Sequence, residues 1–172
     1  MRNYGSYCAR AVLVAATGCH KSAPAPTGQP TPWGFRITWP GEPDEMPPAN
    51  RKAGEPWTYM AFYTDKSPGR FLQYSVAVVD MGTKAGEMTP KEHLLAAKSA
   101  FQSDESSRKE FEHGPKKLPG LDITKKLSGK FRKERAIASG TRVYEIGVTA
   151  QTEDALGAPE VKKFFESFGV DE

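Results

Sequence analysis

The chain has 172 residues, of which 38% are hydrophobic and 26% are charged, and its formal net charge is +3. This composition suits one folded domain and is not that of a disordered chain. The three excess cations, Arg2, Arg10 and Lys21, fall in residues 1–32, which contain no acid, so residues 33–172 are formally neutral. A neutral body argues against a nucleic-acid-binding domain, and no apolar run approaches the roughly 20 residues of a membrane-spanning helix.

Residues 1–18 have the order of features found in a secretory signal. Two arginines come first, a short apolar run follows at residues 11–16, and small residues come last. The ATGC segment at residues 16–19 resembles the lipobox of bacterial lipoproteins, in which the cysteine becomes the lipidated first residue. We therefore expect cleavage before Cys19 and lipidation of its thiol. The alternative is a cytosolic N-terminal segment that happens to end in cysteine.

A proline-rich tether follows the expected anchor. Residues 22–32, SAPAPTGQPTP, contain no residue that would enter a core, and such a segment is extended. The only other cysteine is Cys8, so a disulfide framework is not expected. The expected organisation is a signal at 1–18, a lipidated Cys19 with its tether at 19–32, and one domain at 33–172. Such a protein is exported and faces the periplasm or the cell surface.

Alternation of apolar and polar residues predicts the strands of this domain. Strands are expected at residues 33–39, 57–64, 70–80 and 121–127. Residues 131–139 and 141–150 are expected to form a hairpin about Ser139 and Gly140. Because short turns join most of these strands, the sheet is expected to be largely antiparallel.

Two helices are expected to cover the sheet. The first opens at Thr89, where Thr89 and Glu92 form a capping box and Pro90 takes the first helical position. The second starts at Pro159 and carries apolar residues at positions 161, 164, 165 and 168, which form one stripe. The residues thus predict an α+β domain with a mostly antiparallel sheet of about six strands and two main helices.

Three motifs resemble those of PsbP-like domains. FRITWPGEP at residues 35–43 is similar to the F-x-V-x-F-P-x-x-P opening of that family, GTRVYEI at 140–146 to its G-x-R-x-Y strand, and FFESF at 164–168 to its last helix. The resemblance covers about residues 33–169. It implies an α/β/α sandwich and an accessory or binding role, as in small bacterial lipoproteins of this type. It transfers no binding residues.

The sequence contains no motif for catalysis, metals or cofactors. His93 and His113 are twenty residues apart, without the spacing of metal ligands, and there is no nucleophile elbow or phosphate-binding glycine loop. We therefore expect no catalytic residue, no metal and no cofactor. A hydrolase remains a weaker alternative, which needs a histidine or a pair of carboxylates converging in a cleft.

The charge of the domain is uneven. Residues 116–142 carry nine cations against Asp122 and Glu134. A docking patch is expected there at Lys125, Lys126, Lys130, Arg132, Lys133 and Arg135. It would bind an acidic protein or an anionic component of the envelope. The alternative is a set of solvated sheet residues that discourage edge pairing.

The strand at residues 57–64 is aromatic on both faces. Trp57, Tyr59 and Tyr63 are therefore candidates for a ligand groove, with burial in the core as the alternative. The function expected first is a non-catalytic envelope lipoprotein, an accessory or adaptor domain that binds another macromolecule and no nucleic acid. The second is a lipoprotein that binds a small ligand in the aromatic groove.

Overall fold

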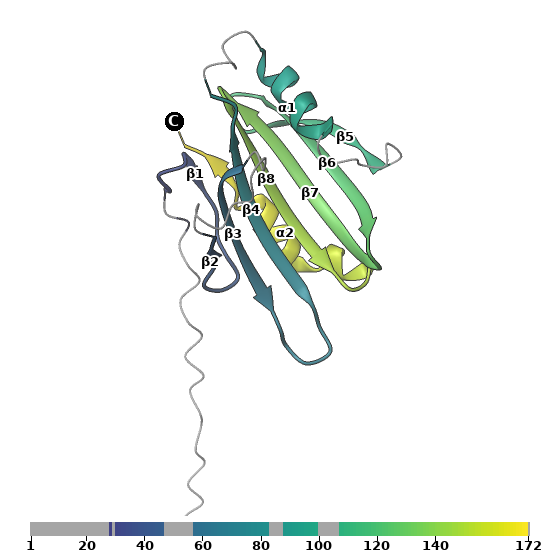
Figure 1. Ribbon diagram of the computed structural model, residues 1–172. Helices are drawn as coiled ribbons and strands as arrows, with labels where there is room; N and C mark the ends of the chain where they lie inside the picture. Colours follow the sequence, from purple (N-terminus) through teal and green to yellow (C-terminus); the bar gives the residue numbers. More distant parts are fainter. Residues whose placement is uncertain (1–27, 29, 47–56, 83–87, 100–106, 172) are drawn as a thin grey trace, which may run out of the picture.

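The computed structural model describes residues 28, 30–46, 57–82, 88–99 and 107–171. These residues form an α+β fold in which a central antiparallel sheet lies between two α-helices (Figure 1). The expected fold class, a mostly antiparallel sheet flanked by two main helices, is therefore confirmed. The signal, Cys19 and most of the tether lie outside the described residues.

The main sheet has seven strands, each antiparallel to its neighbours. Their order across the sheet is β2 (Asp44–Glu45), β3 (Trp57–Asp65), β4 (Leu72–Asp80), β8 (Arg142–Ala150), β7 (Lys130–Ser139), β6 (Leu118–Leu127) and β5 (Lys109–His113). A second sheet pairs β1 (Phe35–Arg36) with β9 (Gly169–Val170). Side chains along each long strand alternate between the two faces of the main sheet.

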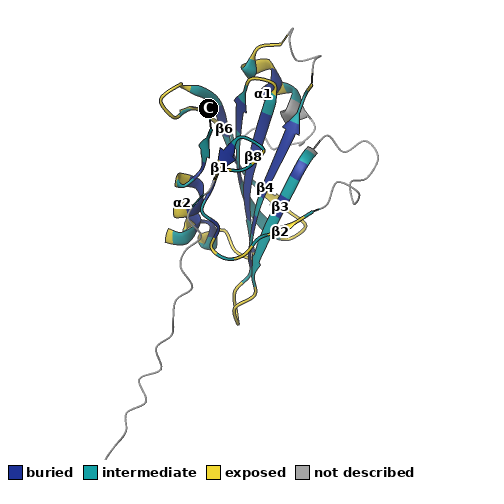
Figure 2. Cartoon of the chain, turned by 90° about the vertical axis from the view of Figure 1, so that its left-hand side faces the viewer, coloured by how far each residue is buried: buried dark blue, intermediate teal, exposed yellow. Residues whose placement is uncertain are grey.

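The helix α2 (Pro159–Glu166) covers one of these faces, which we call the α2 face. Its apolar stripe is buried, and the ring of Phe164 meets that of Tyr74 on β4 edge-on, with 5.0 Å between the centroids. The 3-10 helix η4 (Asp154–Gly157) leads into α2 and buries Leu156. Figure 2 shows buried residues along the sheet side of α2 and exposed residues on its outer side.

The small β1–β9 sheet completes this layer. Phe35 of β1 is fully buried and stacks on Phe168 with 5.8 Å between ring centroids. Trp39, which follows β1, packs against Phe164 at 5.4 Å. Residues from both ends of the domain thus close the same core.

The helix α1 (Pro90–Ser99) lies on the opposite face, which we call the α1 face (Figure 2). Its capping box forms as predicted: the Thr89 amide donates to Glu92 Oε2 at 2.6 Å, and the Glu92 amide donates to Thr89 Oγ1 at 3.3 Å. Leu94 joins an apolar cluster with residues of β4, β6, β7 and β8. Neither helix of the described part of the chain is long and apolar enough to cross a membrane.

The strands differ from expectation mainly at the edges. Residues 33–39 contribute only a two-residue strand, because only Phe35 and Arg36 find partners, in β9. The edge strand β5 and the two-residue strands β2 and β9 were not expected. The sequence of β5, KEFEH, is mostly charged, which is a composition that edge strands use to discourage further pairing.

We expect Phe165→Ala to lower the free energy of unfolding by about 3–5 kcal/mol, because it removes a ring that is 3% exposed from the core beneath α2. Lys163→Ala on the exposed side of the same helix is the matched control, with an expected change below about 0.5 kcal/mol. Urea unfolding at pH 7 measures both values. Equally small losses in the two variants would place Phe165 outside the core.

Candidate functional site

Helix α1 covers only one end of its face of the sheet (Figure 1). The other end of that face carries polar side chains. Each central strand changes along its length from apolar residues beneath α1 to polar residues beyond it. On β8, for example, Val143 is followed on the same face by Glu145 and Thr149. We call the six residues gathered there the polar cluster: Ser75, Lys125, Arg132, Glu134, Glu145 and Thr149.

Strand register brings this cluster together. Lys125 of β6 lies opposite Arg132 of β7, which lies opposite Thr149 of β8. One step further along, Glu134 lies opposite Gly147, and Gly147 lies opposite Ser75 of β4. The cluster lines a cavity of about 300 Å³, whose apolar wall is supplied by Met60, Ala77 and Leu127.

Arg132 is fixed across the middle of the cluster. Its Nη1 donates to Thr149 Oγ1 at 3.1 Å, and its Nη2 donates to Ser75 Oγ at 3.2 Å. Its Nε lies 3.5 Å from Glu134 Oε2. A Cβ atom on residue 147 would lie only 2.3 Å from Arg132 Nη2. Gly147 therefore leaves the space that the guanidinium occupies.

Lys125 and Glu134 form a buried ion pair. Lys125 Nζ lies 3.0 Å from Glu134 Oε2, and the two side chains are 9% and 5% exposed. The contact is not aligned as a hydrogen bond, because Glu134 Oε2 has no hydrogen-bond partner among the described residues. One carboxylate thus faces two cations, Lys125 and Arg132, which leaves this trio with one positive charge in excess.

Glu145 is the most unusual group of the cluster. It is 7% exposed, and its Oε1 has no hydrogen-bond partner within the described part of the chain. Burial raises the pKa of its carboxyl group to about 8, and repulsion by Glu134 adds to the rise, while Arg132 and Lys125 oppose it. Glu145 therefore holds a proton at neutral pH.

The two histidines lie outside the polar cluster and do not meet. His93 belongs to α1 and is buried, with its Nδ1 3.0 Å from the carbonyl oxygen of Gly140. The His113 ring lies 5.7 Å from that of Phe168, and burial together with the charge of Arg135 lowers its pKa. Among the described residues, no group of three or more histidine, cysteine or acidic side chains is placed to hold a metal ion.

A second cavity, of about 270 Å³, lies where β5 and the β5–β6 turn approach the β1–β9 sheet. His113 and Phe168 line it, together with Arg36 and Asp171. Arg36 Nε and Asp171 Oδ1 are 3.1 Å apart, so the two charges largely satisfy each other. Asp171 Oδ2 has no hydrogen-bond partner among the described residues, so this cavity contains one such oxygen, whereas the polar cluster contains two.

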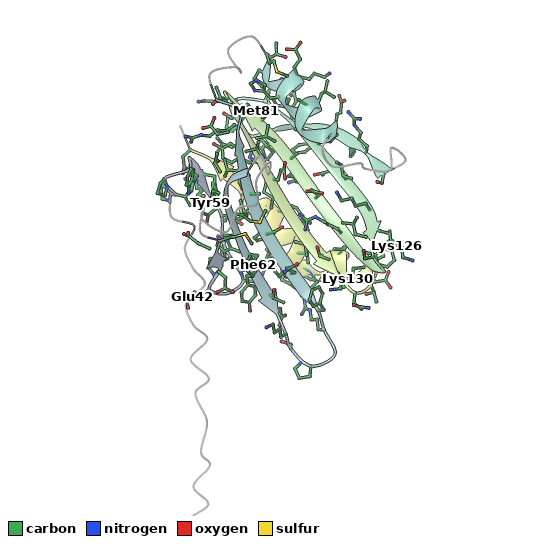
Figure 3. The ribbon with its side chains drawn as sticks, viewed as in Figure 1. Glu42, Tyr59, Phe62, Met81, Lys126 and Lys130 are labelled. Atoms are coloured by element: carbon green, nitrogen blue, oxygen red, sulfur yellow. The ribbon has the colours of Figure 1, made fainter. Side chains whose placement is uncertain are left out.

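The six cations expected to form one docking patch lie on both faces of the sheet. Lys125, Lys130 and Arg132 lie on the α1 face, and Lys126, Lys133 and Arg135 lie on the α2 face. Figure 3 shows Lys126 and Lys130 at the end of the β6–β7 hairpin far from α1. The expectation that side-by-side strands gather these charges on one surface is corrected, because alternation separates neighbours such as Lys125 and Lys126.

The expected aromatic groove is not assembled in the form predicted. Tyr59 is 8% exposed, its ring packs 5.4 Å from Trp33, and its hydroxyl donates to Glu45. Tyr63 packs at 6.1 Å from Tyr74 on the same α2 face. Both tyrosines therefore belong to the core and its margin. The side chain of Trp57 lies outside the described residues.

Sequence reasoning did not identify Ser75, Glu134, Glu145 or Thr149 as site residues. Glu134 was counted only as a charge that offsets its basic neighbours. The available signal was Glu145, a lone acid between Tyr144 and Ile146 in a mostly apolar strand. A solvent-facing position on an alternating strand explains such an acid equally well.

Sequence and structure give different results when the chain is compared with known proteins. No model of a protein family matches it, and no curated protein matches it. Among solved structures, a crystal structure from Bacteroides thetaiotaomicron VPI-5482 superposes with a TM-score of 0.47 at 10% sequence identity. The match covers 85% of this chain and 48% of the other, so this chain spans about half the length of that structure's chain.

Glu145 should make stability depend on pH. Its pKa rises from 4.5 to about 8 on folding, so between these values the folded state keeps a proton that the unfolded state releases. The free energy of unfolding should therefore fall as pH rises through this window, by up to about 1.4 kcal/mol per pH unit. Below the window both states are protonated, and above it the loss is complete.

Glu145→Gln should remove this dependence, because an amide does not titrate. The variant should exceed the unsubstituted protein in stability at pH 8.5, and the difference should shrink toward pH 5. Glu166→Gln, at an exposed position of α2, is the control and should follow the unsubstituted protein. Denaturant unfolding across this pH range provides the measurement, and parallel curves for all three proteins would contradict the assignment.

Proposed function

We propose that the chain is a non-catalytic binding domain that takes a small polar ligand into the cavity of the polar cluster. The observation that carries this proposal is the buried carboxyl group of Glu145 in a cavity that it shares with the ion-paired Glu134. Glu145 is 7% exposed, and its Oε1 has no hydrogen-bond partner among the described residues. Buried polar groups are nearly always satisfied, by protein, water or ligand.

Binding suits this cluster better than catalysis. A carboxyl group that holds a proton beside a carboxylate is an arrangement used in acid–base chemistry. Here, however, Glu134 faces both Lys125 and Arg132, so its carboxylate is already ion-paired with two cations. Both histidines lie elsewhere, so a hydrolase would have to use Glu134 and Glu145 as its pair of carboxyl groups, and the ion pairs of Glu134 with Lys125 and Arg132 weaken Glu134 as a base.

A small ligand also suits the geometry better than a macromolecular partner held by a basic patch. The six cations of that patch lie on opposite faces, and Arg135 is held by Asp122 in a paired contact at 2.8 and 2.9 Å. The polar cluster, in contrast, is a single cavity with both polar and apolar walls. Pockets of this kind orient small molecules by a few polar groups.

We also propose that the domain works at the bacterial cell envelope as a PsbP-like lipoprotein. The ATGC segment at residues 16–19, the tether that follows it and the absence of cysteine from residues 33–172 support this placement. The three PsbP-like motifs support an accessory role, since the resemblance to that family implies an accessory or binding protein.

A single methyl group added at residue 147 tests whether the cavity binds a ligand. Gly147→Ala should displace the Arg132 guanidinium, because the added Cβ would lie 2.3 Å from Nη2 and 2.6 Å from Cζ. The fold should persist, since the displaced atoms end a flexible side chain. Gly157→Ala is the matched control, because a Cβ there meets no atom within 4 Å.

A thermal-shift screen of small acids, amines, alcohols and sugars against the full chain should find a ligand that raises the melting temperature. The shift should be lost in Gly147→Ala and kept in Gly157→Ala. A screen without any ligand that depends on Gly147 would contradict the binding function.

The anchor has its own test. Cys19→Ser should move the protein from the membrane fraction to the soluble fraction of the cells, because serine offers no thiol for the lipid. Fractionation followed by immunoblotting measures the distribution. A variant that remains with the membrane, or an unsubstituted protein that is never processed, would contradict lipidation.

A further inference from the structure

We propose that the ligand of the polar cluster is a small organic monocarboxylate, held between the carboxyl group of Glu145 and the guanidinium of Arg132. This inference rests on the proposed binding function and adds the chemical class of the ligand. Its basis is the charge of the cavity, the donors left in it and the apolar wall on one side.

The charge of the cavity favours an anion. Lys125 and Arg132 contribute two positive charges, and Glu134, which lies within 3.5 Å of both, contributes one negative charge. Glu145 adds none while it holds its proton. The charges of the described residues that line the cavity therefore sum to one positive charge, which a single carboxylate neutralises. A bound ammonium group would raise the excess to two unless Glu145 were ionised.

The hydrogen-bond donors of the cavity also favour an anionic ligand. Arg132 donates hydrogen bonds to Thr149 and Ser75, and its Nε lies 3.5 Å from Glu134 without hydrogen-bond alignment. These contacts leave N–H donors of the guanidinium unused among the described residues. A protonated Glu145 offers a further donor from a carboxyl group whose Oε1 has no partner among the described residues. A carboxylate accepts from both sources, and charge-assisted bonds of this type are the stronger ones.

The apolar wall of the cavity restricts the size and polarity of the part of the ligand beyond its carboxylate. Met60, Ala77 and Leu127 line the same cavity of about 300 Å³, which lies at the small end of the range for ligand sites. A short aliphatic or aryl group fits beside these residues. A second charged group on the ligand would find no counter-charge there.

Binding of such an anion should depend on pH through Glu145. The charged groups that act on Glu145 are Glu134 and Arg132 of β7 and Lys125 of β6. The neighbouring strands β3 and β4 present Met60, Ser75 and Ala77 to the cavity, and none of these titrates. Ionisation of Glu145 removes the donor and adds a like charge, so affinity should fall by up to about tenfold per pH unit above its pKa of about 8.

Isothermal titration of the full chain with butyrate, n-butylamine and 1-butanol tests this inference, because the three probes share a chain and differ in their head groups. At pH 7 butyrate should bind and the other two should not. Gly147→Ala should weaken butyrate binding by about tenfold or more, which corresponds to about 1.4 kcal/mol, and Gly157→Ala should leave it unchanged.

Glu145→Gln keeps a neutral donor at residue 145, so it should bind butyrate at pH 7 and lose the fall in affinity above pH 8. Preference for n-butylamine or 1-butanol would overturn the monocarboxylate and leave the binding function standing. Butyrate binding that is equal in Gly147→Ala would also overturn it, since the anion would then bind elsewhere. If none of the three probes binds while the wider screen yields a ligand that depends on Gly147 and is not a monocarboxylate, only this inference falls. If that screen is empty as well, both proposals fall.

Discussion

The short length of α1 sets the properties of the surface on which the candidate site lies. Its ten residues extend about 15 Å, whereas the nine- and ten-residue strands beneath it extend about 30 Å. One helix of this length can bury only about half of its face of the sheet. The α2 face differs because α2, η4 and the β1–β9 sheet together cover it. The sheet therefore has one apolar face and one that changes from apolar to polar along each central strand.

Within the polar half, the contact of Arg132 with Gly147 organises the other groups. The missing side chain at residue 147 lets the guanidinium cross β8 and reach Ser75 on β4 and Thr149 on β8. From that position its Nε also faces Glu134 on its own strand. A lysine at position 132 would lack the planar fork that makes these contacts together. The cavity thus depends on an arginine and a glycine that are neighbours only through strand register.

Local patterns were sufficient for most of the fold. Alternation predicted β3, β4 and the β7–β8 hairpin, and capping chemistry predicted the start of α1, because both signals lie within a few residues. The candidate site was not predicted, because its members come from four strands and meet only through register. Alternation along β6 already separates two of the lysines, because Lys125 shares its face with Leu121 and Ile123, whereas Lys126 does not. A count of charges along the sequence placed both lysines in one patch.

The burial of Glu145 connects the stability of the domain to the chemistry of its site. An uncharged side chain of similar shape would fold without the free-energy cost that an ionised carboxylate incurs away from water. A proton on Glu145 removes that cost and turns an acceptor into a donor. The same exclusion of water lowers the local dielectric constant, which strengthens a hydrogen bond from this donor to an anion. One proton therefore controls both properties over adjoining pH ranges: stability falls as pH rises from about 4.5 to about 8, and the attraction of the cavity for an anion falls above about 8, where the folded protein releases that proton.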